Sequence, residues 1–235
     1  MKFKFDEYSR KARIAPALIA AAPTLFLLWY ASRLGLSGLG FLIGALPLVF
    51  VGAFALLTEQ IVRPLGRRLE KRLVKAWDGL PTTSMLRLSG ARNVALVERR
   101  RADVERVVDF KLPVKSDEEG DPDVADELYA DAVRRANAAV VRAGDRRLLD
   151  ENIQYGFRRN LLALKPFALT LLVISFGTNT FLTYIFSDLA AGASIAILIV
   201  IVTGVWLLVV RRPWVREQAD TFAQRFFDSV ATHDR

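Results

Sequence analysis

The chain has 235 residues, of which 52% are hydrophobic and 25% are charged, and its formal net charge is +8. This mixture is typical of an integral membrane protein with a charged aqueous part. Because the sequence contains no Cys, disulfides, thiol catalysis and Cys-based metal sites are excluded. The single His, His233, lies close to the C-terminus, where a solvated residue is expected rather than a catalyst.

The N-terminal part predicts a basic segment followed by a membrane hairpin. Met1–Arg13 is basic and mildly amphipathic, as in segments that lie on a membrane surface. Ile14–Ala31 and Leu36–Leu57 are apolar runs near the ~20 residues that a helix needs to cross a bilayer, and a short loop with Arg33 joins them. A cleavable signal peptide resembles the first run, but a second run follows almost at once, so two spans are expected.

The following region, Glu59–Lys165, predicts a helical domain. Ile61–Trp77 places leucines at four-residue spacing on one side and cations on the other, which indicates a helix. Thr82 or Thr83 could cap a short helix through Arg87. A further helix is predicted from the valines between Val94 and Val108, with a strand over Asn93–Val97 as the alternative.

An acidic stretch, Lys111–Asp123, predicts a solvated loop that leads into a helix. A calcium loop is disfavoured because Pro122 occupies the turn position that needs Gly. We expect Asp121 to cap a helix over Pro122–Arg142 that ends at Gly144. Asp145 should cap the last cytoplasmic helix, which leads to a kink at Pro166.

The second half of the chain contains a second predicted membrane hairpin. Phe167–Phe186 and Leu189–Val210 are apolar runs without a charged residue, and only Ser187 and Asp188 separate them. Pro213–Val230 then predicts an amphipathic helix. This helix could pack on the cytoplasmic domain, lie in the membrane interface or bind another subunit.

The distribution of Lys and Arg predicts the orientation. Cations crowd the stretches that flank the four apolar runs on one side, whereas the two hairpin loops hold only Arg33 and Asp188. The positive-inside rule therefore places both termini and the central region in the cytoplasm. The predicted fold is an all-α membrane protein with four transmembrane helices in two hairpins. Its parts are the N-terminal segment with the first hairpin over 1–58, a cytoplasmic helical domain over 59–165, the second hairpin over 166–211, and a C-terminal amphipathic helix over 212–235.

Catalysis is not expected. The sequence shows no nucleophile with a base, no Gly-rich phosphate loop followed by Lys, and no set of metal ligands. The adjacent acids Asp150 and Glu151 would face different directions on a helix. Proton- or sodium-coupled transport in small transporters normally needs an ionisable group inside the bilayer, and the four predicted spans contain no charged residue. We therefore expect neither an enzyme nor a coupled transporter, and no cofactor or metal.

The most distinctive feature of the predicted spans is a polar face in Phe167–Phe186. Ser175, Asn179 and Thr183 lie at i, i+4 and i+8, with Thr178 beside them. Such a face could line a pore, or it could form hydrogen bonds between helices of one subunit. Because four helices are too few to enclose a wide aqueous path, a pore would require a homo-oligomer.

Clustered cations could hold an anionic ligand, since phosphate contacts need little more than grouped Arg and Lys. The inner-leaflet charge rule explains the cations next to the spans without a ligand, whereas the triplet Arg99–Arg101 lies farther from any span. The candidate ligand-binding residues are Arg67, Arg68, Lys71, Arg72, Arg99, Arg100, Arg101, Arg158 and Arg159.

Two stretches, WDGLPTTSMLR (Trp77–Arg87) and ENIQYGFRRNLLALKP (Glu151–Pro166), accompany this arrangement of two hairpins around a helical insert. The pattern resembles the tetraspanning effectors of bacterial anti-phage operons, most of all the Hailong-type effector. The resemblance implies a homo-oligomeric ion channel in the bacterial inner membrane, held shut by single-stranded DNA oligomers that a partner nucleotidyltransferase makes. Loss of the oligonucleotide ligand on infection would then open the channel, depolarise the membrane and stop growth.

The sequence therefore predicts a channel gated by an anionic ligand at its cytoplasmic domain. The alternative is a non-conducting membrane anchor or scaffold whose cytoplasmic domain binds a partner protein.

Overall fold

A computed structural model describes residues 7–23 and 61–233, and the regular structure of these residues is helical throughout. The chain divides into two compact units, which are described separately. Unit 1 comprises Met1–Glu70 with Gly156–Val215, and unit 2 comprises Lys71–Tyr155 with Arg216–Arg235. The predicted boundaries followed hydropathy, whereas these units follow packing, so each unit combines segments that are far apart in the sequence.

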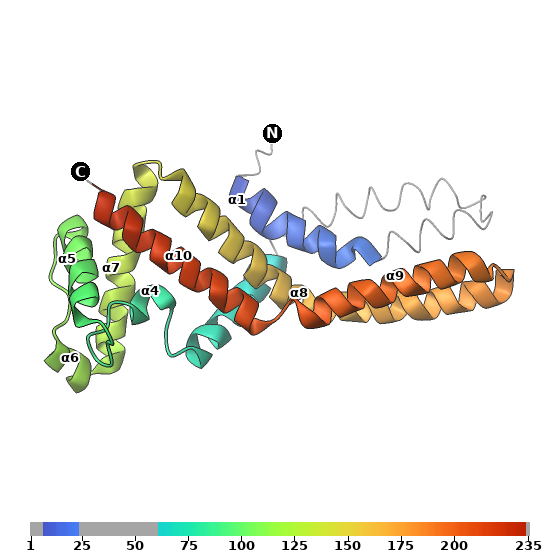
Figure 1. Cartoon of the computed structure of the whole chain (residues 1–235), viewed down its shortest axis with the longest axis horizontal. Coiled ribbons are helices and arrows are strands. Elements are labelled where there is room, and N and C mark those ends of the chain that lie inside the picture. Colours follow the sequence, from blue (N-terminus) through green and yellow to red (C-terminus); the bar gives the residue numbers. More distant parts are fainter. Residues whose placement is uncertain (1–6, 24–60, 234–235) are drawn as a thin grey trace. The chain divides into compact units, whose positions relative to one another are not determined.

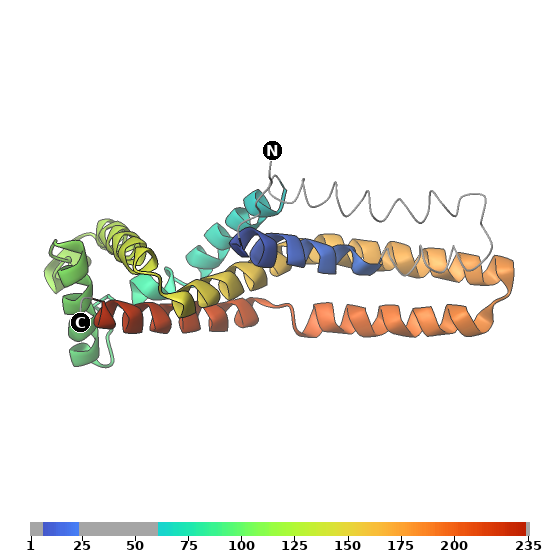
Figure 2. The ribbon, with the colours of Figure 1, turned by 90° about the horizontal axis from the view of Figure 1, so that it is seen from above.

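Unit 1 contains a helical hairpin formed by α8 (Arg146–Phe186) and α9 (Leu189–Leu208). Figures 1 and 2 show the C-terminal half of α8 beside α9. Of the described helices, these two are long and apolar enough to cross a membrane, and only 28% and 22% of their most apolar stretches are buried. The core helix of a soluble protein would be mostly buried, so the exposed apolar surface favours lipid contact.

The turn of this hairpin is as tight as the sequence predicts. Ser187 adopts a left-handed conformation with φ 55°, and Asp188 Oδ1 accepts a hydrogen bond from the amide of Ala191 at 3.2 Å. The amide would otherwise lack a partner at the helix N-terminus. Pro166 lies inside α8, which continues through it as one 41-residue helix. The predicted span Leu36–Leu57 and residues 24–31 of the predicted span Ile14–Ala31 lie outside the described residues.

The N-terminal helix of unit 1 begins with α1 (Glu7–Ser9) and a π-helical turn, η1 (Arg10–Ile14), and continues over 15–23. It packs closely on α8, because a Cβ on Gly156 would lie 2.6 Å from Tyr8 Oη. The side chain of Asn160 donates to the carbonyl of Ala12 at 2.6 Å, within the π turn. Asn160, itself only 1% exposed, thereby gives a buried backbone carbonyl a partner.

A third helical segment, 61–76, approaches α8 at the same level. A Cβ on Gly66 would lie 2.1 Å from Asn160 Oδ1, so only Gly permits this approach. The hydrophobic core of unit 1 lies between these helices and the hairpin. Its buried members are Ala17, Ala20, Val62, Leu161, Leu164, Ala168, Leu172, Ile195, Ile199, Trp206 and Val210.

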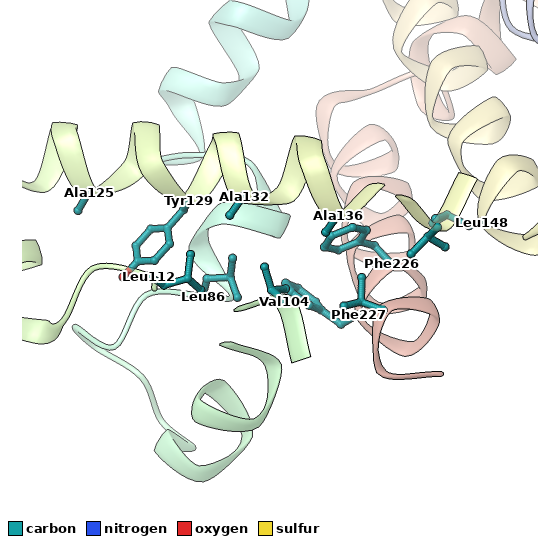
Figure 3. Packing of buried hydrophobic residues seen from close by; sticks show 12 residues of the cluster. Leu86, Val104, Leu112, Ala125, Tyr129, Ala132, Ala136, Leu148, Phe226 and Phe227 are labelled. Atoms are coloured by element: carbon teal, nitrogen blue, oxygen red, sulfur yellow. The ribbon is translucent and has the colours of Figure 1, made fainter. Parts of the chain in front are cut away.

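Unit 2 contains α4 (Pro81–Ser84), α5 (Val94–Val108), α6 (Lys115–Gly120), α7 (Pro122–Arg142), the start of α8 and most of α10 (Arg212–Thr232). Figure 3 shows one face of α7 directed at side chains from other helices and from the loop residues Leu86 and Leu112. This face repeats every three or four residues, as a helix with one buried side requires. The core members are Leu86, Val104, Leu112, Ala125, Tyr129, Ala132, Ala136, Val140, Leu148, Phe226, Phe227 and Val230.

The C-terminal helix, α10, packs into this core through Phe226, Phe227 and Val230, which are at most 5% exposed. Of the three predicted locations for this helix, packing on the central helical domain is the one that the structure shows. Polar contacts at its sides hold the position: Gln218 Nε2 donates to Glu151 Oε2 at 2.6 Å, and Ser229 Oγ donates to Asp145 Oδ2 at 2.6 Å.

The helix predicted over Val94–Val108 is confirmed as α5, with Asn93 as its N-cap, and the alternative strand over 93–97 is excluded. Two other local predictions in unit 2 are corrected. The expected loop Lys111–Asp123 contains the short helix α6. Thr82 and Thr83 lie buried inside α4, which begins at Pro81 without a side-chain cap, because burial in the domain outweighs their capping preference.

The predicted caps of the longer helices are confirmed. Asp121 Oδ1 accepts from the Val124 amide at 3.1 Å at the start of α7. Asp145 Oδ1 accepts from the Leu148 amide at 3.0 Å at the start of α8. Gly144, which follows α7, has φ +86° and so ends the helix where only Gly is unstrained.

Candidate functional site

The predicted polar face of α8 lies against α9. Ser175 and Asn179 are 1% and 2% exposed, whereas Thr178 and Thr183 are partly buried. Asn179 Nδ2 donates to the carbonyl of Gly192 at 3.0 Å, and Thr183 Oγ1 donates to the carbonyl of Asn179 at 2.8 Å. The face therefore forms a polar seam within one chain. For Ser175 and Asn179 to line a pore, the hairpin would have to rearrange.

Gly192 makes this seam possible, and the sequence reasoning did not identify it. A Cβ at position 192 would lie 2.0 Å from Thr183 Oγ1 and 2.8 Å from Thr183 Cβ. The close approach lets the Asn179 amide reach a backbone carbonyl of α9. The signal in the sequence was the run of small residues from Ala190 to Ser194, which is typical of close helix packing in lipid.

Two cationic side chains of α8 bind backbone carbonyls just beyond the C-terminal end of α9. Lys165 Nζ donates to the carbonyl of Val210 at 2.8 Å, where a cation complements the helix dipole. Arg158 donates to the carbonyl of Trp214 at 2.9 Å, and its guanidinium lies 4.8 Å from the centre of the Trp214 ring. Amphipathic Trp and Arg side chains are typical of membrane interfaces.

Arg158 and Arg159, both predicted to bind a ligand, are thus engaged inside unit 1. Arg159 Nη1 lies 2.8 Å from Glu70 Oε1, and the Arg159 side chain is only 13% exposed. A guanidinium in this position neutralises a carboxylate of its own unit, which leaves it poorly placed for a phosphate.

Four other predicted cations lie on the helical segment 61–76. Arg67 and Lys71 are four residues apart, as are Arg68 and Arg72, so all four share one side of the helix. Their side chains are exposed, and none has an ion pair with another described residue. Unpaired like charges at this spacing repel one another, and an anion placed between them would relieve that repulsion.

The three arginines of the predicted Arg99–Arg101 cluster have different environments. Arg99 is exposed. Arg100 is half-buried with its guanidinium 4.9 Å from the centre of the Phe227 ring, and burial lowers the pKa of Arg100. Arg101 is 7% exposed and belongs to the core of unit 2. The prediction that Arg101 shares a phosphate-binding surface with Arg99 and Arg100 is therefore corrected.

Arg101 instead organises a buried polar network. Its guanidinium donates to the carbonyl of Leu86 at 2.9 Å, to Tyr129 Oη at 2.7 Å and to the carbonyl of Pro113. It also lies 3.7 Å from Glu118 Oε1. The network ties α5, α7 and two loop segments together. Arg101 occupies the core face because it is four residues from Val97 and three from Val104, both buried.

Glu118 completes this network. Its carboxylate accepts hydrogen bonds from the amides of Leu88 at 2.9 Å and Ser89 at 2.7 Å, and from Tyr129 Oη. Burial by itself would raise the pKa of Glu118, but the hydrogen bonds from Tyr129, Leu88 and Ser89 lower it below its usual value. Burial, followed by the hydrogen bond to Glu118, raises the pKa of Tyr129 to about 12.

Within the described residues, no group of three or more His, Cys, Asp and Glu side chains is placed to hold a metal ion. Comparison of the chain with protein-family models, curated proteins and solved structures finds no match. Two features of the described chain bear on function: the polar seam of hairpin α8–α9 and the exposed cations of 61–76.

Proposed function

We propose that the chain is a subunit of a homo-oligomeric membrane channel controlled by an anionic ligand at its cytoplasmic domain. The observation that carries the proposal is the polar seam at Ser175, Asn179 and Thr183. It lies inside a pair of apolar helices whose runs Phe167–Phe186 and Leu189–Val210 contain no charged residue. A polar side chain in the middle of a membrane span is energetically costly unless it contacts another helix or lines a path for ions. A hairpin that opens along the seam would expose them to a conducting path.

The ligand in this proposal is an oligonucleotide. Arg67, Arg68, Lys71 and Arg72 offer four exposed positive charges along one helix. The regularly spaced phosphates of a nucleic-acid strand suit such a row of cations, because contacts to phosphates depend on charge and little on the bases. The resemblance to Hailong-type effectors supports a single-stranded DNA oligomer from a partner nucleotidyltransferase as the ligand, and anti-phage defence at the bacterial inner membrane as the role.

A non-conducting scaffold is the second candidate, and a specific observation favours it. Ser175 and Asn179 are buried against the chain itself, as expected if the seam serves only to hold α8 and α9 together. In that case the cytoplasmic domain would bind a partner protein and the hairpins would be anchors.

Ion flux through liposomes that contain the full-length protein separates the two candidates. A channel predicts flux that changes with added single-stranded DNA and that Asn179→Leu alters. The matched control is Thr180→Val, because Thr180 is an exposed residue of α8 whose hydroxyl bonds only to its own helix, at Phe176. Absence of flux under all conditions would favour the scaffold.

Ligand binding has a separate test. Changing Arg67, Arg68, Lys71 and Arg72 together to Glu should abolish binding of single-stranded DNA. Changing two of them to Ala should lower the slope of log K against log salt by about 1.4, since each single-strand phosphate contact contributes about 0.7. The control is Arg142→Ala with Arg147→Ala, because both arginines are exposed and lie outside the segment 61–76. Equal loss in the control would contradict a site on 61–76.

A further inference from the structure

Two buried oxygens of the polar seam have no hydrogen-bond partner among the described residues. They are Ser175 Oγ and Asn179 Oδ1, and their residues are only 1% and 2% exposed. A buried polar atom without a partner is costly, because it has lost its hydrogen bonds to water. Native proteins therefore pair nearly all such atoms, with protein groups or with ordered water. Two orphaned oxygens on one helix face indicate that something further binds there.

Two other polar groups of the same helix face already have partners. The Asn179 amide nitrogen donates to Gly192, and the Thr183 hydroxyl donates to the Asn179 carbonyl. Other hydroxyls of the hairpin bond to the carbonyl four residues earlier in their own helix, as Thr180 does with Phe176 and Ser194 with Ala190. Ser175 does not make this local bond. Its hydroxyl is therefore available to a ligand in the seam.

The spacing of the two residues defines the size of that ligand. Side chains at i and i+4 of a helix have Cβ atoms about 5–6 Å apart. A small group about 2.8 Å from each oxygen, the usual distance between hydrogen-bonded oxygens, can therefore bridge them.

The two oxygens of the seam favour a neutral ligand that donates hydrogen bonds. Asn179 Oδ1 can only accept a hydrogen bond, and Ser175 Oγ can accept or donate one. A cation would also fit the oxygens, but no carboxylate lies between Phe167 and Val210 except Asp188 at the turn, where it caps α9. An uncompensated charge in such surroundings carries a large desolvation cost.

We propose that Ser175 and Asn179 form a binding site for a single buried water molecule in hairpin α8–α9. The water donates one hydrogen bond to Asn179 Oδ1. It forms a second hydrogen bond with Ser175 Oγ, which can act as donor or acceptor. This inference does not rest on conduction, because a scaffold with the same hairpin would hold the same water. If the protein is a channel, the site places water at the seam before the seam opens.

The direct test is the transfer of magnetisation from water to the Asn179 side-chain amide in full-length, ¹⁵N-Asn-labelled protein in lipid nanodiscs. The Asn179→Leu variant assigns the signal. A long-lived water should give a cross-peak to Asn179 Nδ2 in the wild type, and Ser175→Ala should weaken it at least severalfold. Asn160 is an internal control, because its amide nitrogen donates to Ala12 and its oxygen accepts from Arg159. No cross-peak at Asn179 in the wild type would overturn the proposal.

Thermal unfolding provides an independent readout. If water bridges the two oxygens, Ser175→Ala should lower the Tm by about 2–4 °C, the shift that a loss of ~1 kcal/mol gives in a chain of this size. If the oxygens are bare, the same change removes an unpaired group and should raise the Tm, which would overturn the proposal. Thr180→Val is the matched control, with little change expected. A wild-type Tm that rises with Na⁺ or K⁺ over N-methylglucamine, lost in Ser175→Ala, would assign the site to a cation and refute water.

Discussion

Buried polar side chains distinguish the two units at the level of single residues. In unit 2, Arg101, Glu118 and Tyr129 satisfy one another and several backbone groups, so the network joins its helices without leaving a charge alone. In unit 1, Ser175 and Asn179 each retain a buried oxygen without a partner among the described residues. The first arrangement is typical of a core in which buried polar contacts fix one packing of the helices. The second is typical of a site that binds something small or that changes its structure.

The burial of Arg101 predicts a large effect on stability. Arg101→Met should reduce the free energy of unfolding by about 3–5 kcal/mol, because it leaves the Glu118 carboxylate buried without its cation. Chemical denaturation of the full-length protein in detergent, followed by circular dichroism, measures this. Arg99→Met is the matched control, since Arg99 is exposed on the same helix, and its effect should stay within about 0.5 kcal/mol. Similar losses for the two variants would contradict the buried network.

Glu118 also predicts a dependence of stability on pH. Its pKa is lowered in the folded chain relative to the usual 4.5, so the unfolded chain binds the proton more tightly. The resulting stabilisation is complete above pH 4.5 and is lost as the pH falls through the folded pKa. Wild-type protein should therefore lose more unfolding free energy between pH 6 and pH 3 than Glu118→Gln does. Parallel pH profiles for the two proteins would show that Glu118 is not the group involved.

At the level of elements, glycines decide how closely the helices of unit 1 approach. Gly66 faces Asn160, Gly156 faces Tyr8, and Gly192 faces Thr183, in each case with no room for a Cβ. Helices in lipid gain little from burying apolar area against each other, so close backbone contact and interhelical hydrogen bonds supply the association. The seam hydrogen bond from Asn179 to Gly192 depends on such a contact.

This packing predicts that Gly192→Ala destabilises the hairpin by about 1–3 kcal/mol, the usual cost of overpacking. The added Cβ would lie 2.0 Å from Thr183 Oγ1. Gly204→Ala on the same helix is the control, because its Cβ would meet nothing within 4 Å and Ala favours the helix. Thermal unfolding in micelles measures both variants. Adding Thr183→Ala to Gly192→Ala should restore part of the loss, and no recovery would argue against the α8–α9 contact.

At the level of the whole molecule, the two units differ in what they present to their surroundings. The hairpin of unit 1 exposes large apolar side chains along both helices, among them Val173, Ile174, Ile197 and Val200, which suits lipid. Unit 2 buries Tyr129, Phe226 and Phe227 in one core and exposes many of its charged side chains. This contrast supports a membrane hairpin joined to an aqueous domain.

The proposed orientation can be tested with single cysteines, since the natural chain has none. A membrane-impermeant maleimide should label Ser187→Cys in intact cells, because the positive-inside rule places this turn outside. Arg99→Cys should react only after the membrane is permeabilised, and Val173→Cys, on the lipid-facing surface, in neither case. Labelling of Arg99→Cys in intact cells would reverse the predicted orientation.

The sequence alone determined the features that depend on local pattern. The bounds of α5, α7 and the hairpin α8–α9, the capping by Asp121 and Asp145, and the end of α7 near Gly144 follow from periodicity, capping chemistry and apolar length. These properties act within a few residues, so no tertiary contact was needed to recognise them.

Only the tertiary structure decided what each polar side chain does. Three adjacent arginines look alike in the sequence, yet Arg99 is exposed, Arg100 covers Phe227 and Arg101 enters the core. The polar face of α8 was compatible with a pore or with a helix contact, and the approach of Gly192 buries it inside the hairpin. Residues from distant parts of the chain determine whether each of these side chains is buried and which groups it contacts. The charge and the spacing of residues along one helix do not specify these contacts.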